Sequence, residues 1–303
     1  MNPPTFQGEK TAKVFALGLG AQKAGTSWLH EMLAASSQAD MGFTKEYHIW
    51  DGLTDPEFAV WKPTLTNHFA RPTANPAWWF DRLRKLGGLR QRAALAASPD
   101  SYFDYFAGLL AQDGTTLTGD LTPAYGVLSE EVLRRIVDGF AARGVATKAV
   151  FVMRDPVERT WSALRMNKRA FDERNLMRHE RASDEEEIRR FVDLPSYRAR
   201  GDYAAVLTRM DAVFARENRL AALYENLFTA ETVGAICAML GIARVAIDAE
   251  RRVNVTHKTG DLSDDTQRHI AGIFRPSYIA CAERFGRDAI RAAWPSARFI
   301  FDS

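Results

Sequence analysis

The stretch "GLGAQKAGTSWLHEML" at residues 18–33 decides the fold that we expect for this chain. It follows a short apolar run at Val14–Leu19 and opens a segment whose apolar residues have helical spacing. Gly20 and Gly25 keep the spacing of the nucleotide-binding loop G-x-x-x-x-G-K-[ST], in which backbone amides at a helix start bind a phosphate. The stretch therefore predicts a strand, a phosphate-binding loop and a helix in succession.

The lysine of this loop is displaced from its usual position. Lys23 lies inside the loop, and Thr26 and Ser27 follow the second glycine, where the common loop has lysine and then a hydroxyl residue. In the common loop that lysine reaches the β- and γ-phosphates and the hydroxyl holds Mg²⁺. The displacement keeps a phosphate site but disfavours a magnesium–triphosphate. A lysine inside the loop can instead stabilise charge on a bridging oxygen as it leaves.

The wider pattern favours an α/β fold. Helical segments, including one from Thr26 to about Ser37 and one that begins near Ser129, alternate with short apolar runs. Five runs have the composition of buried strands: Val14–Leu19, Ala39–Phe43, Thr116–Leu121, Lys148–Met153 and Arg219–Tyr224. This alternation predicts a P-loop-like three-layer fold, with a central, mostly parallel sheet of about five strands flanked by helices.

Two regions interrupt the alternation, near residues 52–113 and 168–200. Neither has a clear linker at both ends, so we expect helical insertions into a single domain that spans residues 1–303. The acidic run Asp184–Glu187 in the second region is more typical of a solvated helix face than of a functional site.

Composition and cysteine usage disfavour several other classes of protein. Lys and Arg number 40 against 38 Asp and Glu, a balance that argues against a nucleic-acid partner. Cys237 and Cys281 have no metal-site spacing, so we expect free buried thiols. No apolar run approaches the ~20 residues of a membrane helix, and residues 1–13 lack an apolar signal core. We therefore expect a cytoplasmic protein without an integral membrane segment, and the sequence leaves its oligomeric state open.

A second anion-binding element is predicted at "VFVMRDPVERTWSALR", residues 150–165. Asp155 suits a helix N-cap and Pro156 the first helical position, so a helix begins directly after the strand. Arg154 ends that strand at the sheet edge where α/β folds place their sites, and Ser162 follows on the helix. An arginine with a hydroxyl suits a terminal phosphate.

A candidate general base lies in "TKEYHIWD", residues 44–51. In an extended segment Glu46 and His48 project to the same side, and Asp51 is near enough to orient the imidazole. A carboxylate held beside a histidine and a lysine can take a proton from an attacking group.

These motifs resemble those of sulfotransferases that use 3′-phosphoadenosine 5′-phosphosulfate (PAPS). "QKAGTSWL", residues 22–29, looks like the family's 5′-phosphosulfate loop. The resemblance implies that the sulfonate donor PAPS is bound by Lys23, Ala24, Gly25, Thr26 and Ser27. It implies further that no metal is required. It also implies that Arg154 and Ser162 bind the 3′-phosphate, because the family has an arginine and a serine at this spacing. "HKTG", residues 257–260, resembles its C-terminal basic loop, with Lys258, Thr259 and Gly260 as donor-binding candidates.

The base segment resembles the K-E-x-H-x-x-D element of glycosaminoglycan sulfotransferases, including the heparan sulfate 3-O type. There the glutamate is the proposed base, which gives Glu46 that role and His48 and Asp51 supporting roles. "GDLTPAY", residues 119–125, resembles the family's E-K-[ST]-P-A-Y element, but Leu121 replaces the lysine that helps at the reacting sulfonate. That role is left to Lys23 or Lys45.

The resemblance implies transfer of a sulfuryl group from PAPS to an acceptor hydroxyl, or to an amine, which leaves adenosine 3′,5′-bisphosphate. The acceptor is expected to be a small molecule, a carbohydrate or a lipid, recognised by the two inserted regions. Two alternatives stay open at this point. One is a metal-dependent P-loop kinase or NTPase, and the other is a catalytically silent nucleotide-binding protein, which the loss of lysine at Leu121 would allow.

Overall fold

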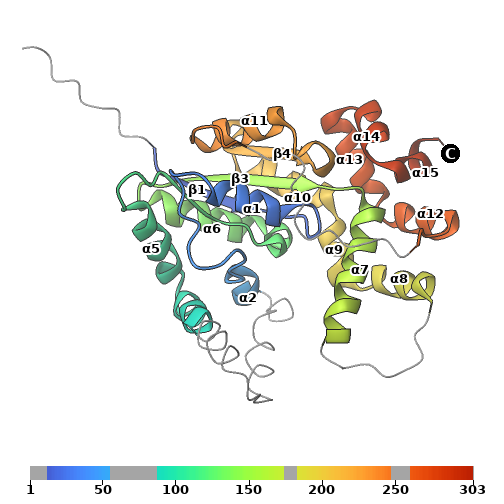
Figure 1. Cartoon of the computed structure of the whole chain (residues 1–303), viewed down its shortest axis with the longest axis horizontal. Helices are drawn as coiled ribbons and strands as arrows, with labels where there is room; N and C mark the ends of the chain where they lie inside the picture. Colours follow the sequence, from blue (N-terminus) through green and yellow to red (C-terminus); the bar gives the residue numbers. More distant parts are fainter. Residues whose placement is uncertain (1–11, 55–86, 174–182, 247–259, 303) are drawn as a thin grey trace, which may run out of the picture.

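A computed structural model describes residues 12–54, 87–173, 183–246 and 260–302 of the chain (Figure 1). Its centre is a sheet of four parallel strands in the order β2-β1-β3-β4. The strands are β1 (Val14–Gly18), β2 (Leu117–Asp120), β3 (Ala146–Met153) and β4 (Arg219–Leu223). The α/β class and the parallel sheet predicted from the sequence are therefore confirmed.

The register of the sheet brings the two predicted anion-binding elements together. β1 is buried along its whole length and pairs with both β2 and β3. Gly18 at the end of β1 lies opposite Val150 of β3. The amide of Leu19 donates to the carbonyl of Val150 at 2.9 Å, and that of Ala21 to Val152 at 2.6 Å. The loop after β1 therefore runs beside the end of β3, at the edge where parallel sheets form their sites.

The strand predicted at Ala39–Phe43 is wrong. Ala39 makes only an isolated parallel bridge to Leu117, beside β2. Gly42 then turns the chain away with a φ of 74°, and its amide donates to the Asp40 side chain at 2.8 Å. A side chain at Gly42 would collide with the Tyr47 hydroxyl, since an added Cβ would lie 2.0 Å from that oxygen. The apolar run therefore delivers the chain into residues 44–51 and does not extend the sheet.

Helices cover both sides of the sheet. In Figure 1, α11 (Ala230–Leu240) lies above it and α6 (Glu130–Ala141) below it, while α5 (Pro99–Leu110) packs beside β2. Ser129 caps α6 through the amide of Val132, so the helix begins where the sequence predicted. The apolar faces of these helices and the sheet form one core that includes Phe15, Phe106 and Phe140.

The first part of the chain also contributes α1 (Thr26–Ala34), α2 (Trp50–Thr54) and the 3₁₀ turn η2 (Pro123–Val127). α1 ends earlier than the predicted Ser37. The helices that follow β3 are α7 (Pro156–Glu173), α8 (Asp184–Val192), α9 (Pro195–Gly201) and α10 (Tyr203–Val213). Two 3₁₀ turns flank β4, η3 (Arg216–Asn218) and η4 (Tyr224–Asn226).

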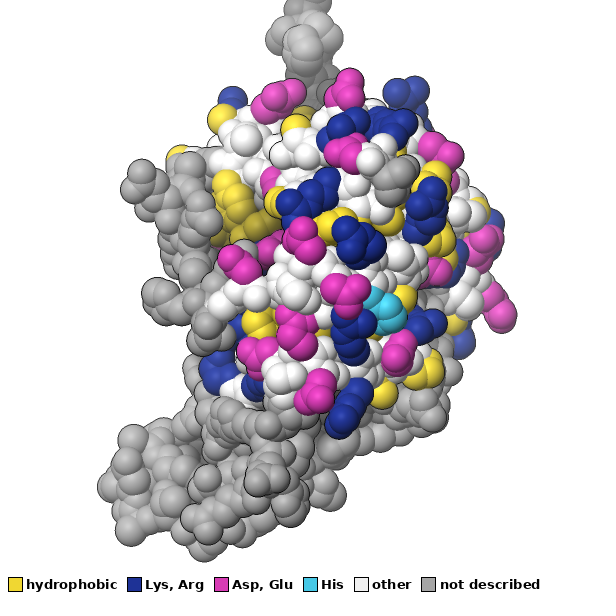
Figure 2. Space-filling model, turned by 90° about the vertical axis from the view of Figure 1, so that its right-hand side faces the viewer, with side chains coloured by type: hydrophobic (Ala, Val, Ile, Leu, Met, Phe, Trp, Pro, Cys, Tyr) yellow, Lys and Arg dark blue, Asp and Glu magenta, His cyan; other side chains and the backbone are white. Residues whose placement is uncertain are grey.

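The C-terminal helices gather beside the start of α7, on the right of Figure 1. They are α12 (Asp264–Ile273), α13 (Arg275–Phe285), α14 (Arg287–Ala293), the turn η5 (Pro295–Ala297) and α15 (Arg298–Phe301). On the face that Figure 2 shows, Lys and Arg side chains are interspersed with Asp and Glu, and neither charge dominates. Among the described residues, no helix is long and apolar enough to cross a membrane.

The regions predicted as insertions hold helices where the structure describes them: α2 and α5 in the first, and the end of α7, α8 and α9 in the second. The acidic run at the start of α8 is anchored, since Asp184 and Glu187 both pair with Lys168 of α7. The run lies in the first turn of a helix and its side chains stay at least partly exposed, as the sequence predicted. Cys237 and Cys281 are free and buried, as predicted. The single-domain boundary stays a prediction.

Candidate active site

A cleft of about 750 Å³ opens at the carboxyl edge of the sheet. It collects most of the residues that the sequence singled out, from the loop after β1, the base segment and the start of α7. The predicted residues on its wall are Lys23, Gly25, Thr26, Ser27, Glu46, His48, Arg154 and Ser162. Segments more than a hundred residues apart in the sequence thus share one cavity.

The phosphate loop has the geometry that an anion site needs. Gly25 is the N-cap of α1 and has a φ of 84°. Because glycine has no side chain, it makes no capping hydrogen bond to the first amides of the helix. An added Cβ at Gly25 would lie 2.7 Å from Cδ2 of Leu227, so only glycine fits here. Helix-start amides carry partial positive charge and bind anions. The loop can therefore hold a phosphate through backbone groups.

Lys23 lies on the cleft wall in a strained backbone conformation. Its φ of 68° is in the left-handed region, and among the described non-glycine residues His48, with a φ of 55°, is the other one recorded there. Burial lowers the pKa of Lys23, and the positive charges of Arg169, Arg154 and Lys45 lower it further. Such strain and such a cluster of like charge are typical of sites that await an anionic ligand.

Arg154 reaches the same space from the end of β3. Its guanidinium donates to the backbone carbonyl of Lys23 at 3.4 Å and to the carboxylate of Glu158 at 3.2 Å, and it lies over the ring of Tyr224 at 4.9 Å. Ser162 lies on α7 and its side chain is largely buried but lines the cleft. The arginine and the hydroxyl therefore face one cavity, as the predicted phosphate pair requires.

Asp155 fixes the start of α7. Its carboxylate accepts the amide of Val157 at 2.9 Å, which is the N-cap bond that the sequence predicted. It also accepts the Tyr278 hydroxyl at 3.0 Å and the Ser296 amide at 3.0 Å. Because Asp155 is fully buried and follows Arg154 directly, these bonds tie the C-terminal helices to the arginine of the cleft.

The base segment places Glu46, His48 and Asp51 in one chain of hydrogen bonds. Nε2 of His48 lies 3.3 Å from Oε2 of Glu46, and Nδ1 lies 2.7 Å from Oδ2 of Asp51. The Glu46 side chain is 32% exposed and also pairs with Lys45, whereas Asp51 is buried behind the imidazole and does not line the cleft. The structure therefore contains the contact between Asp51 and the His48 imidazole that the sequence predicted.

The charges of this group stabilise one another. Burial alone would lower the pKa of His48, but hydrogen bonds to Asp51 and Glu46 raise it to about 9. Burial alone would raise the pKa of Glu46, but His48 and Lys45 lower it to about 2. At neutral pH His48 is therefore held as the imidazolium, with Glu46 on one side of the ring and Asp51 on the other. Glu46 is ready to accept a proton, but as a weak base while both cations hold it.

The sequence missed the support beneath this segment. Asp120, at the end of β2, is fully buried and accepts hydrogen bonds from the hydroxyls of Thr122 at 2.6 Å, Tyr125 at 2.7 Å and Tyr102 at 3.1 Å. Burial raises the pKa of Asp120 to about 6, although these three hydroxyls act to lower it. The only sequence signal was the match of residues 119–125 to a family element, which gave Asp120 no role.

These hydroxyls hold the backbone on both sides of His48. The Thr122 hydroxyl accepts the amide of Tyr47 at 3.0 Å, and the Tyr125 hydroxyl accepts the amide of Ile49 at 3.1 Å. The guanidinium of Arg92 donates to the carbonyl of Glu46 at 2.6 Å from a third direction. The left-handed backbone of His48 is therefore enforced by buried hydrogen bonds.

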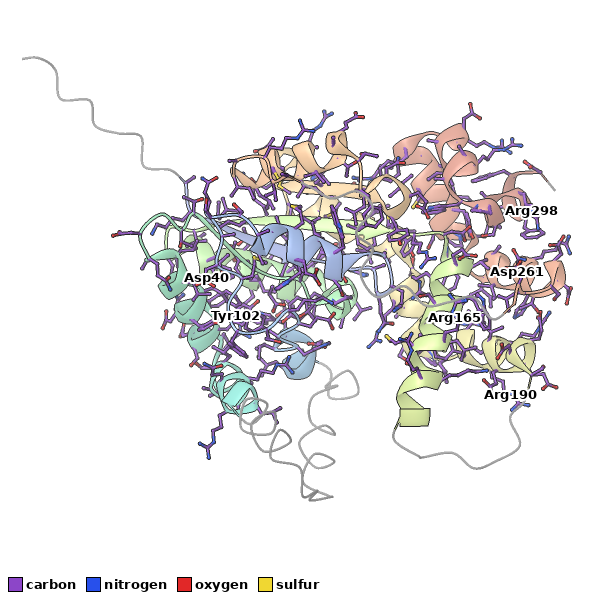
Figure 3. All side chains as sticks on the ribbon, viewed as in Figure 1. Asp40, Tyr102, Arg165, Arg190, Asp261 and Arg298 are labelled. Carbon is purple, nitrogen blue, oxygen red and sulfur yellow. The ribbon has the colours of Figure 1, made fainter. Side chains whose placement is uncertain are left out.

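Other residues on the wall had no sequence assignment. Two aromatic side chains, Trp28 and Tyr224, flank the loop, and both contact Phe228. Arg169 lies seven residues after Ser162 on α7, so helical spacing could have found it. Tyr197 and Arg200 come from α9 and have no such signal, and Asn167 donates to the Tyr197 hydroxyl at 3.0 Å. Figure 3 labels Arg165, which lies on α7, the helix that also carries Ser162 and Arg169.

Several predicted donor-binding residues are not on the cleft wall. Ala24 is fully buried in the core, so its side chain serves packing. Gly260 is exposed and does not line the cleft, while Lys258 and Thr259 lie outside the described residues. The part of the chain that the structure describes contains no group of three His, Cys, Asp or Glu side chains suited to a metal ion. Independence of a metal stays a prediction.

Comparison with known proteins supports the fold. No family model matches the chain, and no curated protein matches it. Among solved structures, a sulfotransferase from Alicyclobacillus acidocaldarius superimposes with a TM-score of 0.57 at 24% sequence identity, over 92% of this chain and 99% of that chain. The chain therefore shares the overall fold of that protein along nearly its whole length.

Two further solved structures are more distant. The sulfotransferase domain of the Synechococcus PCC 7002 olefin synthase has a TM-score of 0.43 at 15% identity, over 88% of this chain and 96% of that chain. The sulfotransferase domain of the curacin biosynthetic pathway has a TM-score of 0.43 at 13% identity, over 86% and 96% of the two chains.

Proposed function

We propose that this protein is a sulfotransferase that moves a sulfuryl group from PAPS to an acceptor hydroxyl or amine. One observation carries the proposal. The loop at Lys23, the Arg154–Ser162 pair and the hydrogen-bonded carboxylate of Glu46, which are the two candidate anion-binding elements and the candidate base, line the same cleft. The similarity in fold to a solved sulfotransferase supports it.

The two anion-binding elements suit the two phosphate ends of one nucleotide. The amides at the start of α1, with Lys23, Thr26 and Ser27, would hold the 5′-phosphosulfate. Arg154 and Ser162 would hold the 3′-phosphate. Trp28 and Tyr224 also line the cleft, and their rings would contact the adenine. The extra positive charge of Arg169 and Arg200 on the wall would draw a polyanionic donor into the cleft.

The chemistry would be an in-line transfer. Glu46 takes the proton of the acceptor oxygen as that oxygen forms its bond to sulfur, and His48 and Asp51 keep the Glu46 carboxylate oriented. The bond between sulfur and the bridging phosphate oxygen breaks, and its electron pair stays on that oxygen. Lys23 and the loop amides stabilise the charge that develops there. The products are adenosine 3′,5′-bisphosphate and the sulfated acceptor.

The acceptor would enter the cleft beside Glu46, and other residues of the cleft wall would recognise it. Met166, Asn167 and Tyr197 contribute both apolar and polar groups to that wall, which suits a small molecule, a carbohydrate or a lipid headgroup. We keep as part of the proposal that the protein acts in the cytoplasm, without a metal.

The alternative of a P-loop kinase or NTPase has less support. Thr26 occupies the position of the catalytic lysine of those enzymes, and its side chain is largely buried. Calorimetry separates the two readings, because a sulfotransferase should bind adenosine 3′,5′-bisphosphate without a divalent ion and ignore Mg·ATP. Tight Mg·ATP binding with no response to the bisphosphate would overturn the proposal.

Transfer of ³⁵S-labelled sulfonate from PAPS into a panel of alcohols, phenols, sugars and amines then tests activity. Binding of the bisphosphate without transfer to any acceptor in the panel would favour the catalytically silent alternative. A matched Glu46→Gln sample distinguishes enzymatic transfer from background chemistry.

A further inference from the structure

The element at residues 119–125 lacks a cation where the resembling family has one. Leu121 holds that position and is only 1% exposed. It packs on the end of β1, since a Cβ added at Gly18 would lie 2.7 Å from Cδ2 of Leu121. Leu121 does not line the cleft, so this position supplies the core and brings no positive charge to the reacting group.

Lys45 brings a positive charge to the cleft from a different segment. Its ammonium group pairs with the Glu46 carboxylate, and its side chain is 26% exposed. Lys45, Glu46 and Lys23 line the same cleft, so the two lysines and the base share one space. Lys45 is therefore next to the base on one side and near the loop lysine on the other.

The proposed function gives a cation at that position a possible task. If the proposed function is correct, the sulfonate starts beside Lys23, at the bridging oxygen, and ends on an acceptor oxygen beside Glu46. A cation between these two points contacts the three oxygens that stay on sulfur throughout the transfer. Arg169 also lines the cleft, but it comes from α7, the helix of Ser162, whereas Lys45 is the lysine that pairs with the base itself.

We propose that Lys45 is a catalytic residue that releases Glu46 when the donor binds and then holds the sulfonate oxygens during transfer. The inference rests on the proposed function. Without donor, Lys45 and His48 both neutralise Glu46. With donor, the ammonium group of Lys45 moves to the sulfonate, and Glu46 keeps only His48 and becomes a stronger base. No atom is exchanged with Lys45: sulfur leaves the phosphate oxygen, binds the acceptor oxygen, and the acceptor proton goes to Glu46.

The first test compares Lys45→Met with wild-type protein in ³⁵S transfer and in calorimetry with adenosine 3′,5′-bisphosphate. Loss of one preorganised donor to a developing charge typically costs about 10²–10³-fold in kcat. We expect a fall of that size, with a Kd for the bisphosphate within about threefold of wild type. Lys45→Arg should recover much of the activity, and Lys13→Met, at the opposite end of β1, should match wild type in both measurements.

The second test restores the charge chemically. Lys45→Cys treated with bromoethylamine carries an ammonium group at nearly the original position, while Cys237 and Cys281 are buried and protected from the reagent. We expect aminoethylation to restore most of the lost kcat. A partly exposed ion pair contributes little to stability, so these variants should fold, which circular dichroism checks.

The outcomes separate the inference from the function on which it rests. Wild-type protein that neither binds the bisphosphate nor transfers sulfonate would overturn the proposed function. Wild-type protein that does both, with Lys45→Met keeping its full kcat, would overturn only the role of Lys45. A variant that loses bisphosphate affinity as much as kcat, or that aminoethylation does not restore, would also overturn that role.

Discussion

The hydroxyl of Tyr125 donates a 2.7 Å hydrogen bond to the carboxylate of Asp120, and both residues are fully buried. The same hydroxyl accepts the amide of Ile49 at 3.1 Å. Through this one phenol, a carboxylate at the end of β2 fixes the backbone next to His48, and the Thr122 hydroxyl does the same for Tyr47. The position of the candidate base is therefore set by a buried polar network beneath it, which neither Glu46 nor His48 could establish alone.

Replacing Asp120 by asparagine should loosen this network. The amide group cannot accept all three hydroxyl bonds, and a buried donor left without a partner costs about 1–3 kcal/mol. We expect a loss of stability of that order in urea unfolding, together with a lower kcat and an unchanged Kd for adenosine 3′,5′-bisphosphate. Asp113→Asn, which makes the same change at an exposed carboxylate, is a control for the loss of a carboxylate charge as such. Asp120→Asn with wild-type kcat would refute the positioning role.

Glu46→Gln should abolish turnover and leave donor binding intact. The amide keeps the size of the side chain but cannot take a proton, and a general base typically contributes about 10²–10⁴-fold to the rate. We expect a fall in kcat of this size in sulfonate transfer. Calorimetry with adenosine 3′,5′-bisphosphate should give a Kd close to that of wild type. Equal losses in kcat and in affinity would indicate a structural part for Glu46.

Arg154→Gln should weaken binding only of ligands that carry a 3′-phosphate. A hydrogen bond to a charged group is worth about 1.5–3 kcal/mol, which corresponds to roughly 10- to 100-fold in Kd. We expect that loss for adenosine 3′,5′-bisphosphate and little change for adenosine 5′-monophosphate. Ser162→Ala should show the same selectivity with a smaller effect. If both nucleotides lost affinity equally, Arg154 would have to contact the 5′ end or stabilise the loop through the Lys23 carbonyl.

The raised pKa of His48 makes stability depend on pH. Its pKa is about 9 in the folded protein against 6.5 as the ordinary value, because Asp51 and Glu46 outweigh the effect of burial. The stabilisation is fully present below pH 6.5 and is lost as the pH rises through 9. We therefore expect wild-type protein to exceed His48→Gln in stability at pH 6, and the difference to shrink towards pH 9. Urea unfolding of both proteins at several pH values measures it, and a difference independent of pH would contradict the charged state of His48.

The fold could be predicted where short-range patterns specify it. The succession of β1, loop and α1 follows from apolar residues, glycine spacing and a helix start within about twenty residues. The helix start at Ser129 was recognisable for the same reason, since its capping bond to Val132 joins residues only three positions apart. The strand prediction at Ala39–Phe43 failed because an apolar run does not reveal the turn at Gly42, where the Tyr47 hydroxyl leaves no room for a side chain.

The candidate site likewise has parts that the sequence predicts and parts that only the tertiary structure reveals. Sequence by itself determined which residue types could do the chemistry: the loop lysine, the arginine–serine pair and the base segment, each a local pattern with a local physical reason. The tertiary structure alone decided that Asp120 supports the base, that Leu121 turns into the core while Lys45 faces the cleft, and that α9 adds Tyr197 and Arg200 to its wall. These facts depend on burial and on contacts between segments far apart in the chain, and such contacts leave no periodic trace in the order of amino acids.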